Sequence, residues 1–101
     1  MENYIYDLLM DHIGPMRWPK GDHEHPLIIN GEWVGYVITE KYGYNVTIKA
    51  YIGGNCASYI EECIDISCWE DQQLYIKSVF CHKLAESLLE MGMEVRSVSI
   101  D

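Results

Sequence analysis

Apolar residues recur at helical spacing near the start of the chain. Residues 3–13 place Ile5, Leu8, Leu9, His12 and Ile13 on one face, a pattern typical of a short amphipathic helix. Gly14-Pro15 ends this helix, because Gly permits a left-handed exit and Pro cannot continue the hydrogen-bond ladder. The segment 15–26 contains three prolines, which predicts a loop. Trp18 in this loop either packs into the core as a plug or is exposed for binding a partner.

In the middle of the chain the pattern changes to short apolar runs separated by turn residues. Asn30-Gly31 lies between such runs, the arrangement of a tight hairpin whose central residues both adopt positive φ. The strand after this turn runs to about residue 40, and Tyr42-Gly43 makes the next turn. Residues 44–52 then alternate, with Val46, Ile48, Ala50 and Ile52 inward and Asn45, Thr47, Lys49 and Tyr51 outward. One apolar and one polar face predict an antiparallel sheet that is covered on one side.

Residues 59–66 alternate isoleucines with acidic residues. This alternation favours a fourth strand with an acidic outer edge. A short helix opening at Asn55 stays open as an alternative, because Asn followed by Cys-Ala-Ser also suits a helix start.

The longest helical pattern covers residues 68–91. Its apolar stripe is formed by Ile76, Phe80, Leu84, Leu88 and Met91, widened by Val79 and Cys81. Ser67-Cys68-Trp69-Glu70 fits a capping box at its start, and Gly92 suits the position just past its end. Residues 94–100 indicate a closing strand. The predicted order is α-β-β-β-(β)-α-β, a single α+β domain with a long C-terminal helix across an antiparallel sheet of four to five strands.

Charge adds a second feature, because 16 acids outnumber 7 bases and the net charge is -9. Residues 50–76 carry five of these acids and neither Lys nor Arg; the five are Glu61, Glu62, Asp65, Glu70 and Asp71. Glu86 and Glu90 lie four residues apart on one face of the long helix. Such a surface repels nucleic acid and attracts basic proteins. Eight tyrosines and three tryptophans against one phenylalanine also suit a contact surface.

Residue patterns that carry catalytic chemistry are weak in this chain. His23-Glu24-His25 is suited to a metal ion, but a catalytic zinc needs a third protein ligand and no HExxH motif is present. Cys56, Cys63, Cys68 and Cys81 lack the spacing of a zinc knuckle, and Cys81 and His82 point about 100° apart on a helix. Gly53-Gly54 does not continue into a phosphate-binding loop. We therefore predict no enzyme and no cofactor.

The cellular setting follows from two further absences. No apolar run approaches the roughly 20 residues of a membrane helix, so we expect no membrane partner. Residues 1–14 carry three acids and no positive region, so we expect no signal peptide and a cytoplasmic protein with reduced thiols.

Small size, acidity, tyrosine content and the lack of catalytic motifs together resemble the small acidic anti-CRISPR proteins that phages encode. The resemblance is one of class and includes no shared motif. It implies a phage protein acting in the host cytosol, which occupies the nucleic-acid- or PAM-reading surface of a CRISPR effector.

Three functional hypotheses remain. The first is a non-enzymatic inhibitor that covers the basic groove of a nucleic-acid-binding protein, without binding nucleic acid itself. Its partner-binding residues would be Glu61, Glu62, Asp65, Glu70, Asp71, Glu86, Glu90, Tyr51 and Trp18. The second is an interaction module, such as an immunity-type protein or an assembly subunit, that binds through a Tyr/Trp patch. The third is a small metal-dependent enzyme using His23, His25 and a thiol.

Overall fold

The computed structural model describes residues 2–43, 45–52, 58–65 and 70–101, with the side chains of all but residues 2, 45, 58–65 and 70–72. The elements follow the predicted order: α1 Glu2–Ile13, β1 Gly21–Ile29, β2 Glu32–Tyr42, β3 Asn45–Ile52, β4 Ser58–Asp65, α2 Glu70–Glu90 and β5 Val98–Ile100. The described strands form one antiparallel sheet in the order β4-β3-β2-β1-β5. The predicted α+β fold is confirmed, including the fourth strand. The proposed capping box and Gly53-Gly54 lie outside the described residues.

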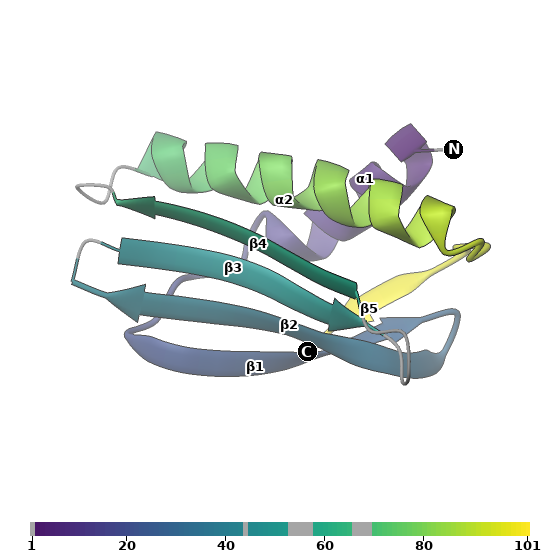
Figure 1. The fold of residues 1–101 in the computed structure, drawn as a ribbon, viewed down its shortest axis with the longest axis horizontal. Helices are drawn as coiled ribbons and strands as arrows, with labels where there is room; N and C mark the ends of the chain where they lie inside the picture. Colours follow the sequence, from purple (N-terminus) through teal and green to yellow (C-terminus); the bar gives the residue numbers. More distant parts are fainter. Residues whose placement is uncertain (1, 44, 53–57, 66–69) are drawn as a thin grey trace.

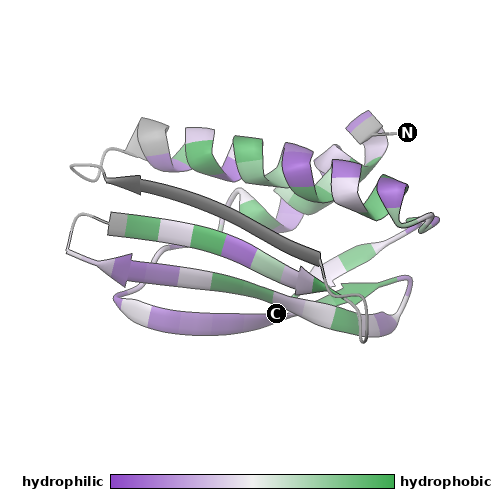
Figure 2. Cartoon of the chain, viewed as in Figure 1, coloured by the Kyte–Doolittle hydropathy of each residue, from purple (hydrophilic) through white to green (hydrophobic). Residues whose placement is uncertain are grey.

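Both helices lie on the same side of the sheet (Figure 1). α2 packs on β3 and β4, and α1 packs against α2 and β5. Apolar and polar positions alternate along β3 and along α2 (Figure 2), and the apolar ones meet between the two layers. The buried core there includes Ile5, Leu9 and Ile13 of α1, Val46, Ile48, Ala50 and Ile52 of β3, and Ile76, Phe80, Leu84 and Leu88 of α2. Neither of these helices covers the opposite face of the sheet, which we call the open face.

The hairpin between β1 and β2 has the predicted turn, because Asn30 and Gly31 adopt φ angles of 55° and 81°. The side chain of Asn30 also reaches the C-terminal segment. Its Oδ1 accepts from the backbone N–H of Arg96 at 2.7 Å and of Ser97 at 3.1 Å, and its Nδ2 donates to the carbonyl of Glu94. Because these backbone groups bond to a side chain, the predicted strand over 94–100 is shortened to Val98–Ile100.

The loop predicted over 15–26 is too long, because β1 already begins at Gly21. Pro26 is compatible with this strand for a geometric reason. Its carbonyl accepts from the N–H of Asp101 at 3.3 Å, on the side of β1 that faces β5. The missing N–H of a proline at this position therefore points away from β2, and no bond of the β1–β2 ladder is lost.

A β-bulge interrupts β2 close to the hairpin. Leu27 pairs with Gly35 whereas Ile28 pairs with Trp33, so Val34 is an extra residue in β2. At Gly35 the strands approach closely, since a Cβ atom placed there would lie 1.8 Å from the carbonyl oxygen of Tyr51. Only glycine fits this position. The bulge brings Trp33 to the same face as Tyr36, although regular alternation would place residues three apart on opposite faces.

Candidate binding surface

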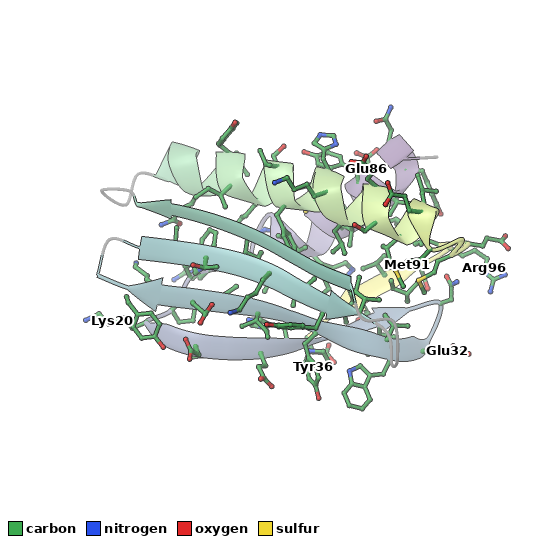
Figure 3. The ribbon with its side chains drawn as sticks, viewed as in Figure 1. Lys20, Glu32, Tyr36, Glu86, Met91 and Arg96 are labelled. Carbon is green, nitrogen blue, oxygen red and sulfur yellow. The ribbon has the colours of Figure 1, made fainter. Side chains whose placement is uncertain are left out.

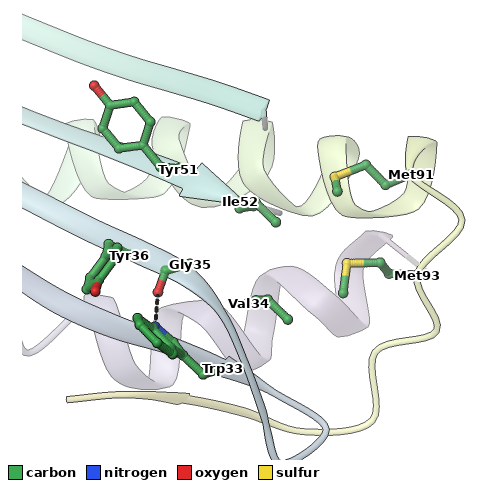
Figure 4. A pocket seen from close by; sticks show the side chains of 8 residues that line it. All are labelled: Trp33, Val34, Gly35, Tyr36, Tyr51, Ile52, Met91 and Met93. Atoms are coloured by element: carbon green, nitrogen blue, oxygen red, sulfur yellow. Dashed lines mark hydrogen bonds between the residues drawn. The ribbon is translucent and has the colours of Figure 1, made fainter. Parts of the chain in front are cut away.

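Three aromatic side chains of neighbouring strands lie on the open face, and we call them the aromatic cluster: Trp33 and Tyr36 of β2, which lie together, and Tyr51 of β3, whose ring points away from these two (Figure 4). Tyr36 and Tyr51 are cross-strand partners. The rings of Trp33 and Tyr36 meet edge to face, with centroids 5.3 Å apart and planes at 85°. Trp33 is 63% exposed and Tyr51 is 39% exposed. The indole Nε1 of Trp33 donates to the carbonyl of Gly35 at 2.9 Å, which fixes the orientation of an otherwise exposed ring.

The aromatic cluster borders an apolar groove of about 630 Å³, whose remaining lining residues are Val34, Gly35, Ile52, Met91 and Met93. Met91 and Met93 follow the end of α2, so the groove reaches from the open face towards the helix layer (Figure 4). Methionine side chains adapt their shape to what they contact. The groove is therefore suited to the apolar side chains of a partner.

Acidic side chains accompany the aromatic cluster on the open face. Asp22 and Glu24 of β1 are both exposed, and the register places Asp22 opposite Glu40 of β2. Glu40 forms an ion pair with Lys49, with 2.7 Å between Oε1 and Nζ. Asp22 accepts a hydrogen bond from the hydroxyl of Tyr42, which raises the pKa of that tyrosine. A partner that contacts the cluster together with this acidic border would need positive charge.

Of the two predicted aromatic anchors, only Tyr51 belongs to this surface. Trp18 is 6% exposed, and its Nε1 donates to the carbonyl of Thr47 at 3.1 Å. The interpretation of Trp18 as a core plug is therefore confirmed. A ring buried to this extent offers little area to an anchor contact on the protein surface.

The predicted acidic residues fall into two groups. Glu86 and Glu90 are exposed on α2, and Glu86 points away from the sheet (Figure 3). Glu61, Glu62 and Asp65 lie on β4, at backbone positions paired with Lys49, Ile48 and Asn45, while Glu70 and Asp71 begin α2. The side chains of these five lie outside the described part of the chain, so their clustering stays a prediction. Because 15 residues of helix separate Asp71 from Glu86, about 22 Å lies between the backbone positions of these two residues along α2.

Sequence reasoning missed Trp33, the most exposed member of the aromatic cluster. Regular alternation along β2 would separate Trp33 from Tyr36, so the pattern gives no reason to group them. The available signal was Gly35, because a glycine inside a strand often marks a bulge or a close backbone approach.

The two histidines that the sequence offered for metal binding each lie beside a backbone carbonyl. His23 Nε2 lies 2.9 Å from the carbonyl of Lys20, and His25 Nδ1 lies 3.3 Å from that of Asp101. Among the described residues, no three His, Cys, Asp or Glu side chains are grouped so that they could hold a metal ion. Burial raises the pKa of the Cys81 thiol to about 12, so the reactive thiolate is disfavoured at neutral pH. Neither helix of the described chain is long and apolar enough to cross a membrane.

Comparison with protein-family models, with curated proteins and with solved structures found no match. A functional proposal for this chain therefore depends on the geometry of the open face, the groove and the surrounding charge.

Proposed function

We propose that the protein is a non-enzymatic binding protein that docks a basic protein partner on the open face of its sheet. The observation that carries this proposal is the aromatic cluster, which lies exposed beside an apolar groove on a face that neither described helix covers. Exposed aromatic residues grouped beside a groove are typical of protein contact sites.

The aromatic cluster has the physical properties of an energetic anchor. Its rings are amphipathic and large, and truncating such an anchor in a protein interface costs about 2 kcal/mol or more. The hydrogen bond from Trp33 to Gly35 already restricts the indole, so binding loses little side-chain entropy. The exposed acids Asp22 and Glu24 would steer a basic partner towards this face and disfavour an acidic one.

A narrower form of the proposal is that the partner uses the same basic surface to hold nucleic acid. Its support is the excess of 16 acids over 7 bases, together with the exposed Asp22 and Glu24 on the open face. In that case duplex nucleic acid competes with the protein for the partner. Simultaneous binding of both to one partner would contradict this narrower form and leave the docking proposal intact.

The test compares Trp33→Ala with Tyr75→Ala in affinity capture from a bacterial lysate. Tyr75 is a matched control, because it is 64% exposed but lies on α2 in the helix layer. We expect the wild-type chain and Tyr75→Ala to retain the same basic protein, and Trp33→Ala to lose at least tenfold in affinity for it. Equal retention by Trp33→Ala and Tyr75→Ala would overturn the proposal.

The salt dependence of the dissociation constant distinguishes the contribution of charge to binding from that of the apolar groove. If charge steers and holds the partner, its dissociation constant rises as NaCl increases from about 50 to about 500 mM. A partner that is lost on Trp33→Ala but retained unchanged at high salt would instead indicate an assembly-type interaction through the apolar groove alone.

A further inference from the structure

A second pocket, of about 520 Å³, lies between the segment after α1, the end of β2 and the first turns of α2. This is the end of the molecule near Lys20, whereas Arg96 lies at the other end (Figure 3). Its lining includes Arg17, Trp18, Lys41, Gln73 and Lys77. We call it the basic pocket.

The described residues that line the basic pocket have a charge opposite to that of the chain. It holds three of the seven basic residues in a protein with 16 acids, and none of the described residues that line it is acidic. Lys41 also lines an adjacent pocket together with Lys20, so a fourth basic residue lies next to it. In a chain of net charge -9, this concentration of cations needs a physical explanation.

The innermost cation of the basic pocket is held in place by backbone groups. Lys77 is only 7% exposed. Its Nζ donates to the carbonyl of Gly14 at 3.0 Å and to the carbonyl of Met16, and lies 5.7 Å from the centre of the Trp18 ring. The indole of Trp18 is itself fixed by its bond to Thr47. The Lys77 ammonium group is therefore held in a fixed place in the pocket, with two of its three donors used by these carbonyls and one left for an anion.

The other cations approach from separate elements. Lys41 pairs with the buried Val46, which places it on the helix-covered side of the sheet, and Arg17 is exposed at the rim. A guanidinium group binds two oxygens of a phosphate at once, and lysines add point charges. Three cations match the charge of a phosphate dianion better than that of a single carboxylate.

We propose that the basic pocket binds a small molecule through a phosphate group. A volume of about 520 Å³ is within the usual range for small-molecule sites. The Gln73 side chain supplies an uncharged donor beside the cations. This site is separate from the aromatic cluster, so it goes beyond the proposed docking function and does not depend on it.

The first test is an NMR titration of the whole chain with inorganic phosphate, inorganic pyrophosphate and citrate at constant ionic strength. We expect saturable shifts of the Trp18 indole N–H and of the backbone amides around Met16 and Gln73, with pyrophosphate binding tighter than phosphate. The absence of saturable shifts would overturn the proposal. If citrate binds as tightly as pyrophosphate, the proposed preference of the basic pocket for phosphate over carboxylate groups is wrong.

The second test uses charge-matched variants. Arg17→Gln and Lys41→Gln should each weaken pyrophosphate binding about tenfold, because each removes one charge-assisted contact. Arg96→Gln makes the same change of net charge at the other end of the molecule and should leave binding unchanged. An equal loss in Arg17→Gln and Arg96→Gln would show a non-specific charge effect and refute the site. Trp33→Ala should bind pyrophosphate like the wild type, whether or not the docking proposal holds.

Discussion

At the scale of single residues, Gly35 determines the shape of the candidate binding surface. It lies beside the bulge at Val34, and the backbone of β3 approaches it so closely that no side chain fits. The bulge brings Trp33 beside Tyr36, and the carbonyl of Gly35 accepts the indole N–H. One small residue therefore positions the aromatic cluster, although it contributes no side chain to it.

Gly35→Ala should destabilise the protein by about 2–3 kcal/mol, because its methyl group would force β2 and β3 apart. Gly31→Ala is the matched control. That position has a φ of 81° but nothing within 4 Å of a Cβ atom, so only about 1 kcal/mol of backbone strain is expected. Urea unfolding of both variants measures the difference. If Gly35→Ala destabilises the protein no more than Gly31→Ala does, β2 and β3 can move apart at Gly35 without a large loss of stability.

At the scale of elements, the sequence predicted most of the fold, because turn chemistry and alternation are local. Asn30-Gly31 located the hairpin, and the alternation of 59–66 identified β4. Two predicted strand boundaries were wrong, because contacts between residues distant in the sequence determine them. The prolines of 15–26 predicted a loop where β1 begins, but Pro26 is tolerated in this strand because its nitrogen faces away from β2. The closing strand was overextended because Asn30, more than 60 residues away, bonds to its first backbone groups.

Asn30 has two roles: it adopts the positive φ of the hairpin turn, and its side chain bonds to the C-terminal segment. Two substitutions distinguish these roles. Asn30→Gly keeps the positive φ but loses three side-chain hydrogen bonds, at a cost of about 2 kcal/mol. Asn30→Ala adds about 1 kcal/mol of backbone strain. Hydrogen exchange at Ser97 and Ser99 should accelerate in both variants, while exchange in β3 follows only the change in global stability. Unchanged protection at Ser97 would contradict the anchoring role.

At the scale of the whole molecule, the two candidate sites differ in how far the sequence could predict them. Tyr51 and the acidic residues were identified by residue type alone. The basic pocket was not, because Arg17, Lys41 and Lys77 are distant in sequence and meet only when α1, β2 and α2 are assembled. The described lining of this pocket carries three of the seven basic residues and no acid, an unevenness of charge that the composition does not reveal.

The net charge of -9 should also make stability depend on salt. The molecule measures 37 × 26 × 20 Å, whereas the Debye length falls from about 20 Å at 20 mM salt to about 4 Å at 500 mM. Acids across the molecule therefore repel one another at low salt and are screened at high salt, so NaCl should raise the Tm by a few degrees in phosphate-free buffer.

Variants on α2 test whether this salt response comes from the acidic charge. The double variant Glu86→Gln/Glu90→Gln changes the net charge from -9 to -7, and should be more stable at low salt and gain less from NaCl. Lys83→Gln changes it to -10 and should show a larger gain. Thermal unfolding followed by circular dichroism measures all three chains. A Tm that falls with salt would show that ion pairs such as Lys49–Glu40 outweigh repulsion between acids.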